Sequence, residues 1–166
     1  QMALPVSTSN WQWLLDKGLD NVDNRNSAIG TDPAIWQRLF TAPDTLRQRV
    51  ALALSEFFVV GFDGLSGAWK QFKLAAWWDL LTTHAFGNYR TLLEAVTLNA
   101  AMGQYLSSNG NQKENPATGR LPDENYAREV MQLFSIGLYE LNADGTPFLF
   151  GGAATAETYT QDTVTQ

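Results

Sequence analysis

The stretch PDENYAREVMQLFSIGLYEL, residues 122–141, decides the fold. Its apolar residues recur at intervals of three and four, which is the spacing of one face of an α-helix. They are Tyr126, Val130, Leu133, Phe134, Gly137, Leu138 and Leu141. Pro122 suits a first helical turn, and the acidic Asp123 and Glu124 complement the positive end of the helix dipole. We therefore expect one long helix over residues 122–141, with its aromatic and aliphatic side packed inward.

The same spacing recurs through the rest of the chain. It predicts further helices over residues 11–17, 32–40, 45–60, 66–84 and 88–106. The helix over 45–60 has a wide apolar stripe and is expected at the centre, whereas the helix over 66–84 has two apolar faces and is expected to be buried on two sides. No strongly alternating pattern typical of strands occurs. The predicted fold class is therefore all-α, an irregular helical bundle of about five to six helices with little or no sheet.

Capping residues mark the expected helix ends. Ser9 or Asn10, Asp32, Ser66 and Asn88 are the expected N-caps, and Gly18 and Gly87 the expected stops. The length of 166 residues suits one domain, so residues 1–166 are expected to form a single helical domain. Residues 160–162 resemble the start of a helix that the chain end cuts off. We therefore expect a domain truncated at its C-terminus.

Composition and charge exclude several classes of protein. The net charge is −6, and the eleven Lys and Arg residues are scattered along the chain. A nucleic-acid-binding protein needs a basic patch, and so does a protein that binds an anionic membrane surface. We therefore expect no nucleic-acid partner and, since no stretch approaches 18 apolar residues, no membrane span. The absence of cysteine excludes disulfides, thiolate nucleophiles and Cys-type zinc sites.

A polar patch is predicted at the start of the helix over 122–141. Glu124 and Arg128 are four residues apart and can pair, and Asn125 and Glu129 have the same spacing beside them. Such a patch can bind a polar ligand or hold a general acid or base. A solvated i,i+4 ion pair is the other interpretation, worth about 0.3–0.5 kcal/mol. Spacing alone favours the structural interpretation, because such pairs are common.

Three further residues are candidates for function. His84, the only histidine, is a candidate base, although it also suits the end of a helix three residues before Gly87. A lone histidine makes no ordinary zinc site and the EF-hand spacing is absent, so we expect no metal and no cofactor. Trp11 and Trp13 lie about 200° apart on a helix, so one core face cannot take both. An exposed indole offers a flat platform on which a sugar ring can stack.

Three stretches together resemble a known family. They are RVALALSEFFVV (residues 49–60), HAFGNYRTLL (residues 84–93) and PDENYAREVMQLFSIG (residues 122–137). They are similar to the large bacterial family described as "domain of unknown function 1800", whose most recognisable signature is the run ENYARE at residues 124–129. The resemblance covers most of the chain from about residue 32 onward.

The resemblance implies a location and a partner, but no reaction. Family members are large bacterial proteins that often carry export signals, so an extracytoplasmic location is expected: periplasmic, cell-surface or secreted. They are frequently encoded beside an exported family related to sulfatases and alkaline phosphatases, which makes such a protein an expected partner. Many relatives carry histidines where this chain has Ser55-Glu56 and Phe134-Ser135. If those histidines bind a metal, this chain lacks that site.

Two functions remain open from the sequence. The favoured one is an exported helical module with a structural or binding role at the cell surface, whose ligand is a polysaccharide or a protein. The alternative is a hydrolase-type enzyme in which Glu124 or Glu129 is the acid or base and Arg128 binds an anionic group. With the family signature taken into account, the structural and ligand-binding interpretations of these residues carry equal weight.

Overall fold

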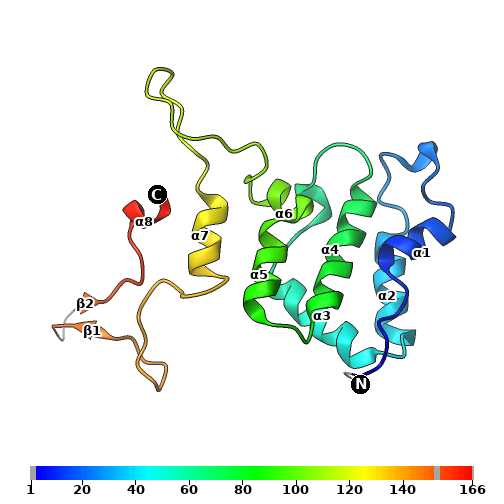
Figure 1. Ribbon diagram of the computed structural model, residues 1–166, viewed down its shortest axis with the longest axis horizontal. Helices are drawn as coiled ribbons and strands as arrows, with labels where there is room; N and C mark the ends of the chain where they lie inside the picture. Colours follow the sequence, from blue (N-terminus) through cyan, green and yellow to red (C-terminus); the bar gives the residue numbers. More distant parts are fainter. Residues whose placement is uncertain (1–2, 152–153, 166) are drawn as a thin grey trace. The chain divides into compact units, whose positions relative to one another are not determined.

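The computed structural model describes residues 3–151 and 154–165, which are mostly helical (Figure 1). The chain divides into two compact units, Gln1–Tyr105 and Leu106–Gln166. The sheet among the described residues is one antiparallel pair of two-residue strands. The all-α class is therefore confirmed, and the expectation of a single domain stays a prediction.

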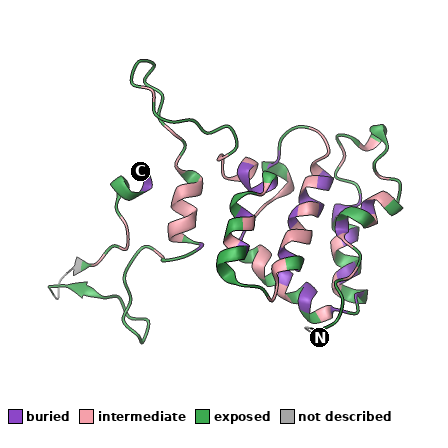
Figure 2. Ribbon diagram, viewed as in Figure 1, coloured by how far each residue is buried: buried purple, intermediate pink, exposed green. Residues whose placement is uncertain are grey.

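The first unit is built around one central helix. Its helices are α1 (Asn10–Asp16), α2 (Thr31–Thr41), α3 (Thr45–Phe57), α4 (Lys70–His84), α5 (Tyr89–Thr97) and α6 (Ala100–Tyr105), with short 3-10 turns η1 (Val22–Asn24) and η2 (Phe62–Gly64). Helix α4 contacts each of the other five helices. Buried residues are distributed along the length of α4 (Figure 2). The prediction that this segment is buried on more than one side is confirmed.

Helix α3 is not the central helix, and the apolar stripe expected inside over residues 45–60 is only partly buried, with Phe58 at its end fully buried. Leu46 and Phe57 were expected inside, but their side chains are 43% and 41% exposed. The buried positions of α3 are Arg47, Gln48 and Ala51. Because Arg47 and Gln48 have polar side chains, hydrophobic periodicity predicts that they face outward.

A buried carboxylate explains why polar residues of α3 face inward. Asp44, which is fully buried, accepts hydrogen bonds from the backbone and the hydroxyl of Ser7 and from the Gln48 amide. Arg47 Nε lies 3.7 Å from the same carboxylate. Burial alone would raise the pKa of Asp44, but the hydrogen bonds outweigh it and hold that pKa below its ordinary value. Contacts with the Asp44 carboxylate therefore place Arg47 and Gln48 on the inward face of α3.

The expected caps are correct at two helix starts and wrong at two others. Ser9 caps α1 and Asn88 caps α5, each through its side-chain oxygen. Helix α2 begins one residue earlier than expected, after Gly30 at φ +87°, a left-handed conformation that suits glycine. Helix α4 begins at Lys70 instead of near Ser66, because Trp69 at φ +61° turns the chain there.

The helix expected over residues 88–106 is two helices. The Asn99 side-chain oxygen accepts a hydrogen bond from Ala101 N at 2.8 Å and so provides a second N-cap. Helix α5 therefore ends at Thr97 and α6 begins at Ala100. Leu98, between the two, is 79% exposed.

The second unit contains α7 (Asn125–Gln132), the strands β1 (Leu149–Phe150) and β2 (Ala154–Thr155), and α8 (Gln161–Thr165). The strands pair in antiparallel register, with Leu149 opposite Thr155. The helix start predicted at residues 160–162 is confirmed by α8.

The long helix expected over residues 122–141 is wrong beyond Gln132. The backbone N–H of Gly137, at φ +78°, donates to Met131 O at 2.9 Å, which closes the helix end with a left-handed glycine. After Gly137 the chain is extended, and Leu141 pairs with Pro147 in an isolated bridge. Leu133 and Leu141, expected inside, are 53% and 62% exposed. The apolar spacing beyond Gln132 was therefore no sign of a helix.

Candidate functional site

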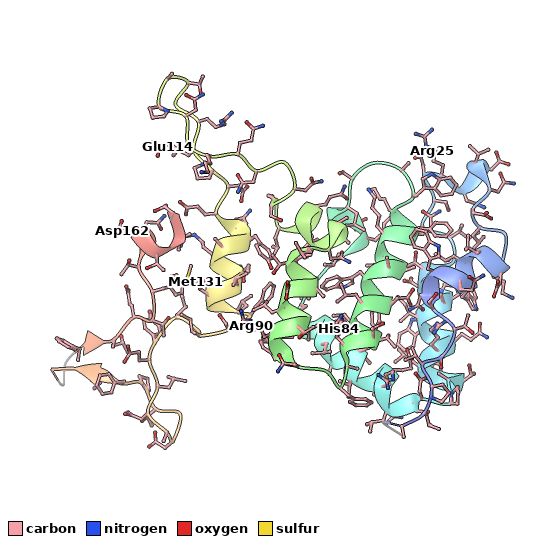
Figure 3. All side chains as sticks on the ribbon, in the orientation of Figure 1. Arg25, His84, Arg90, Glu114, Met131 and Asp162 are labelled. Atoms are coloured by element: carbon pink, nitrogen blue, oxygen red, sulfur yellow. The ribbon has the colours of Figure 1, made fainter. Side chains whose placement is uncertain are left out.

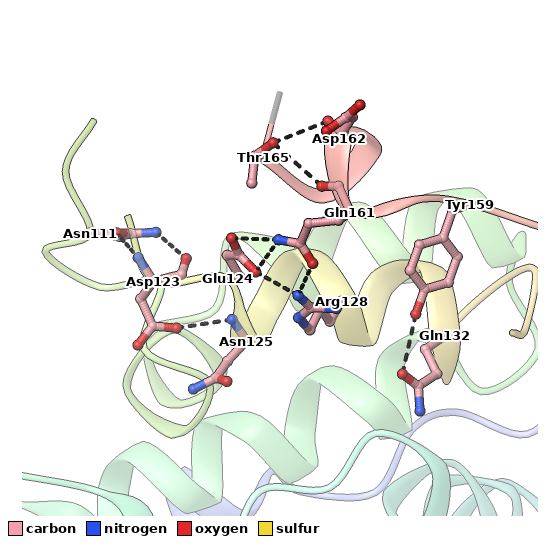
Figure 4. Close-up of polar contacts among 10 residues, drawn as sticks. All are labelled: Asn111, Asp123, Glu124, Asn125, Arg128, Gln132, Tyr159, Gln161, Asp162 and Thr165. Atoms are coloured by element: carbon pink, nitrogen blue, oxygen red, sulfur yellow. Dashed lines mark hydrogen bonds and ion pairs between the residues drawn. The ribbon is translucent and has the colours of Figure 1, made fainter. Parts of the chain in front are cut away.

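The start of α7 is tied to the polar loop that precedes it. The Asn111 amide donates to Asp123 O at 2.7 Å, and Asp123 N donates back to the Asn111 side-chain oxygen at 2.9 Å. The Asp123 carboxylate in turn accepts a hydrogen bond from Asn125 N at 2.9 Å (Figure 4). This reciprocal pairing positions the first turn of α7, where the candidate residues lie.

The predicted ion pair between Glu124 and Arg128 is confirmed. Arg128 Nη2 lies 2.7 Å from Glu124 Oε2. A third residue, Gln161 of α8, joins both: its amide donates to the two Glu124 carboxylate oxygens at 2.9 Å, and its carbonyl oxygen accepts from Arg128 (Figure 4). Sequence reasoning missed Gln161, which follows Glu124 by 37 residues, and found only that a helix begins there.

The surroundings of Glu124 keep its carboxylate ionised. Hydrogen bonds from Gln161 and then from Arg128 lower the pKa of Glu124 below its ordinary value. A general acid at neutral pH needs the opposite shift. The geometry therefore gives Glu124 the role of a link between α7 and α8.

The second predicted pair does not form among the described residues. Asn125 is exposed, and the hydrogen bond of its backbone N–H goes to Asp123. Glu129 is half-buried, and its Oε2 has no hydrogen-bond partner there. Asn125 and Glu129 thus flank the Glu124–Arg128–Gln161 network without joining it.

A polar hollow of about 210 Å³ lies beside this network, within the second unit. Its lining consists of Arg128, Gln132, Leu138, Tyr139, Glu157, Tyr159, Thr160 and Gln161. The Tyr159 hydroxyl donates to the Gln132 side chain at 3.2 Å (Figure 4). Glu124 and Glu129 are not among the lining residues, and Glu157 is the one carboxylate that is. Acid–base hydrolysis with paired carboxylates has no second carboxyl group in this lining.

His84 is the last residue of α4 and is half-buried (Figure 3). Its carbonyl oxygen accepts a hydrogen bond from Gly87 N at 2.9 Å, which confirms that the helix ends just before Gly87. Within residues 3–151 and 154–165, no three His, Asp or Glu side chains gather as a metal site would require. The position of His84 therefore suits the end of a helix.

Trp11 and Trp13 lie on opposite sides of α1 and line two different hollows. Trp11, which is 43% exposed, borders a hollow of about 270 Å³ whose other lining residues are Leu15, Asp20, Trp69 and Phe72. The Trp13 indole N–H donates to the Gln37 side-chain oxygen at 2.9 Å, and Trp13 borders a second hollow. Trp13 is half-buried against the cluster of Leu14, Phe72 and Ala75, and Trp11, although exposed, also contacts Phe72.

The hollow at Trp11 is lined mainly by aromatic side chains. The rings of Trp11 and Phe72 meet edge-on, with centroids 4.8 Å apart and planes at 68°. The rings of Trp69 and Phe72 also meet edge-on, with centroids 5.8 Å apart and planes at 74°. Asp20, an exposed residue, completes a lining that is almost wholly apolar.

These features define an all-α protein with a central helix and a Glu–Arg–Gln network at the start of α7. The family model described as "Protein of unknown function (DUF1800)" matches residues 10–166, and the chain therefore belongs to this family. The search of curated proteins and the search of solved structures found no match. Within the described ranges, no helix has the length and apolar character that crossing a bilayer requires.

Replacing Gln161 by alanine tests the α7–α8 network. We expect the pKa of Glu124 to rise back toward its ordinary value, because the Gln161 hydrogen bonds are the largest cause of its lowering. An NMR titration of the side-chain carboxyl carbons measures this directly. The pKa of Asp144, which hydrogen bonds from Thr146 lower, is the internal control and should not change. An unchanged Glu124 titration would mean that Gln161 does not hold this carboxylate.

Proposed function

We propose that the protein is an extracytoplasmic, non-catalytic module that binds polysaccharide through the hollow at Trp11. The observation that carries the proposal is the meeting of Trp11, Trp69 and Phe72 in one open, largely apolar hollow, with Asp20 among its lining residues. An indole face packs against the C–H face of a sugar ring. The hollow thus offers the stacking surface that a sugar residue needs.

Hydrogen bonds fix the backbone at both tryptophans of the hollow. Trp11 N donates to the Asp79 carboxylate at 2.9 Å, and Trp69 N donates to Arg25 O at 2.8 Å. Trp69 also has a left-handed backbone, which costs a residue other than glycine about 1–3 kcal/mol and is often found at functional sites. This strained position supports the proposal, because it places the second indole at the hollow.

The location and the partner in this proposal rest on the family. An extracytoplasmic site gives a polysaccharide-binding module access to cell-surface glycans. An exported protein related to sulfatases or phosphatases is the proposed partner on the same ground. Fractionation of the source cells tests the location: the proposal requires the protein outside the cytoplasm.

The hydrolase alternative has less support from the geometry. Its main candidate, Glu124, has a lowered pKa and is bonded to Arg128 and Gln161. Its other candidate, Glu129, does not line the polar hollow beside α7. We therefore propose that Glu124 and Arg128 stabilise the second unit and do not act on a substrate.

The test compares two tryptophan variants of the full chain. Affinity electrophoresis against neutral, amine-bearing and acidic polysaccharides identifies which of them slows the wild type. Trp11→Ala should weaken that binding at least tenfold, which corresponds to about 1.4 kcal/mol of lost stacking. Trp36→Ala is the matched control, because Trp36 is 56% exposed and lies on α2 outside the hollow. Equal binding by both variants, or no retardation by any polysaccharide, would reject the proposal.

A further inference from the structure

Arg38 of α2 is a buried arginine in an unusual state. Its side chain lies on the inward side of the helix, and the residue is only 7% exposed. Its buried Nε has no hydrogen-bond partner among the described residues. A buried donor without an acceptor destabilises the folded state, and more so when it is charged. The Arg38 guanidinium is therefore short of hydrogen-bond acceptors within the described residues.

The nearest carboxylates do not provide that partner. Burial lowers the pKa of Arg38, and the charges of Asp79 and Asp44 raise it, so both aspartates act on the guanidinium. The oxygens of Asp79 accept hydrogen bonds from the N-terminal turn of α1, at Asn10 N, Asn10 Nδ2 and Trp11 N. Those of Asp44 accept from Ser7 and Gln48. These two charges offset that of Arg38 without occupying its donors.

Arg38 borders the second hollow at α1, which has a volume of about 300 Å³. The other lining residues are Ser7, Thr8, Trp13, Gln37, Thr41, Ala42 and Pro43. Gln37 uses its carbonyl oxygen for the Trp13 indole, which leaves its NH₂ group as a donor. Thr8 is exposed at the rim and adds a hydroxyl group. The hollow therefore presents a guanidinium, an amide and a hydroxyl as hydrogen-bond donors.

We propose that this hollow binds a carboxylate group, held by the Arg38 guanidinium with help from Gln37 and Thr8. The planar fork of a guanidinium matches the two oxygens of a carboxylate. A single negative charge suits the site better than a phosphate dianion, because Asp44 and Asp79 act on Arg38 and repel each negative charge that a ligand brings. The inference is independent of the polysaccharide site, which lies on the other side of α1.

The experiment follows the Nε–H signal of Arg38 by ¹⁵N NMR in the full chain. Arg38→Lys assigns the signal by removing it. Sodium glucuronate and sodium acetate should each shift it saturably, since both carry one carboxylate. Glucose, the neutral counterpart of glucuronate, should leave it unchanged, and inorganic phosphate should bind more weakly than acetate. If glucuronate binds at least tenfold tighter than acetate, the ligand of the hollow is a sugar acid. If the two bind equally, the hollow recognises only the carboxylate group.

A variant at the rim keeps the proposal testable even if substitutions of Arg38 unfold the protein. Thr8→Trp should fill the hollow and weaken glucuronate or acetate binding at least tenfold, without altering Arg38 itself. Thr91→Trp, an equally exposed threonine on α5, is the matched control and should bind as the wild type does. An unshifted Arg38 signal, a glucose response equal to that of glucuronate, tighter binding of phosphate, or unchanged binding by Thr8→Trp would each overturn the proposal.

Discussion

Trp77→Ala should lower the free energy of unfolding by about 4 kcal/mol, the usual cost of removing a large aromatic side chain from a core. Trp77 is fully buried in α4, the helix that contacts the other five helices of the first unit. Urea denaturation followed by far-UV circular dichroism measures the loss. Trp36→Ala should change stability by no more than about 0.5 kcal/mol, because Trp36 is more than half exposed.

The conservative variant Trp77→Phe separates packing from polarity. The Trp77 indole N–H is buried and has no acceptor among the described residues. Phenylalanine keeps most of the ring and removes that donor, so it should cost much less than alanine. If Trp77→Ala were as stable as Trp36→Ala, α4 would not be the centre of the unit.

Asp79→Ala should lower the free energy of unfolding by about 3 kcal/mol, by the loss of charged hydrogen bonds and of a helix cap. The carboxylate lies on α4 and accepts hydrogen bonds from the first two backbone N–H groups of α1, at 2.6 and 2.9 Å. It also offsets the charge of buried Arg38. Chemical denaturation measures the change, and Asp63→Ala, at an exposed position, is the control. A variant as stable as that control would show that α1 does not depend on this cap.

The pH dependence of the free energy of unfolding gives a second test of the role of Asp79. Burial raises its pKa above the ordinary value, although the hydrogen bonds from Trp11 and Asn10 and the charge of Arg38 oppose the shift. The folded state therefore binds the proton more tightly than the unfolded state. The contribution of Asp79 to stability falls as pH rises from the ordinary carboxyl pKa through the raised one, and is level above it. The fall in stability between the ordinary carboxyl pKa and the raised pKa should therefore be missing in the Asp79→Ala variant.

Periodicity predicted the elements of the fold better than their inward faces. The two apolar faces of residues 66–84 identified α4 correctly, because a helix packed on several sides must be apolar on several sides. The same reasoning failed for α3, and it gave no sign that Arg38 of α2 is buried. Arg47 and Arg38 are buried beside Asp44 and Asp79, and a buried arginine breaks the apolar pattern that marks an inward face.

The candidate site was predictable where it is local and not where it is assembled from distant segments. Glu124 and Arg128 are neighbours on a helical surface, so their spacing was enough. Their third partner, Gln161, comes from another helix, and a single sequence does not show which helices meet. The end of α7 depends on the left-handed turn at Gly137, and a glycine inside an apolar repeat gave too weak a signal to stop the helix. The prediction for Trp11 needed only the opposite placement of two indoles on α1.

The hydrogen bonds from α1 to Asp79 also set an order of events for a chain made from its N-terminus. Helix α1 has seven residues, too few to be stable alone in water. The carboxylate that it needs is 69 residues further along. Helix α1 therefore gains its cap only after the chain as far as Asp79 has left the ribosome, so it forms later than its place before α2 and α3 suggests.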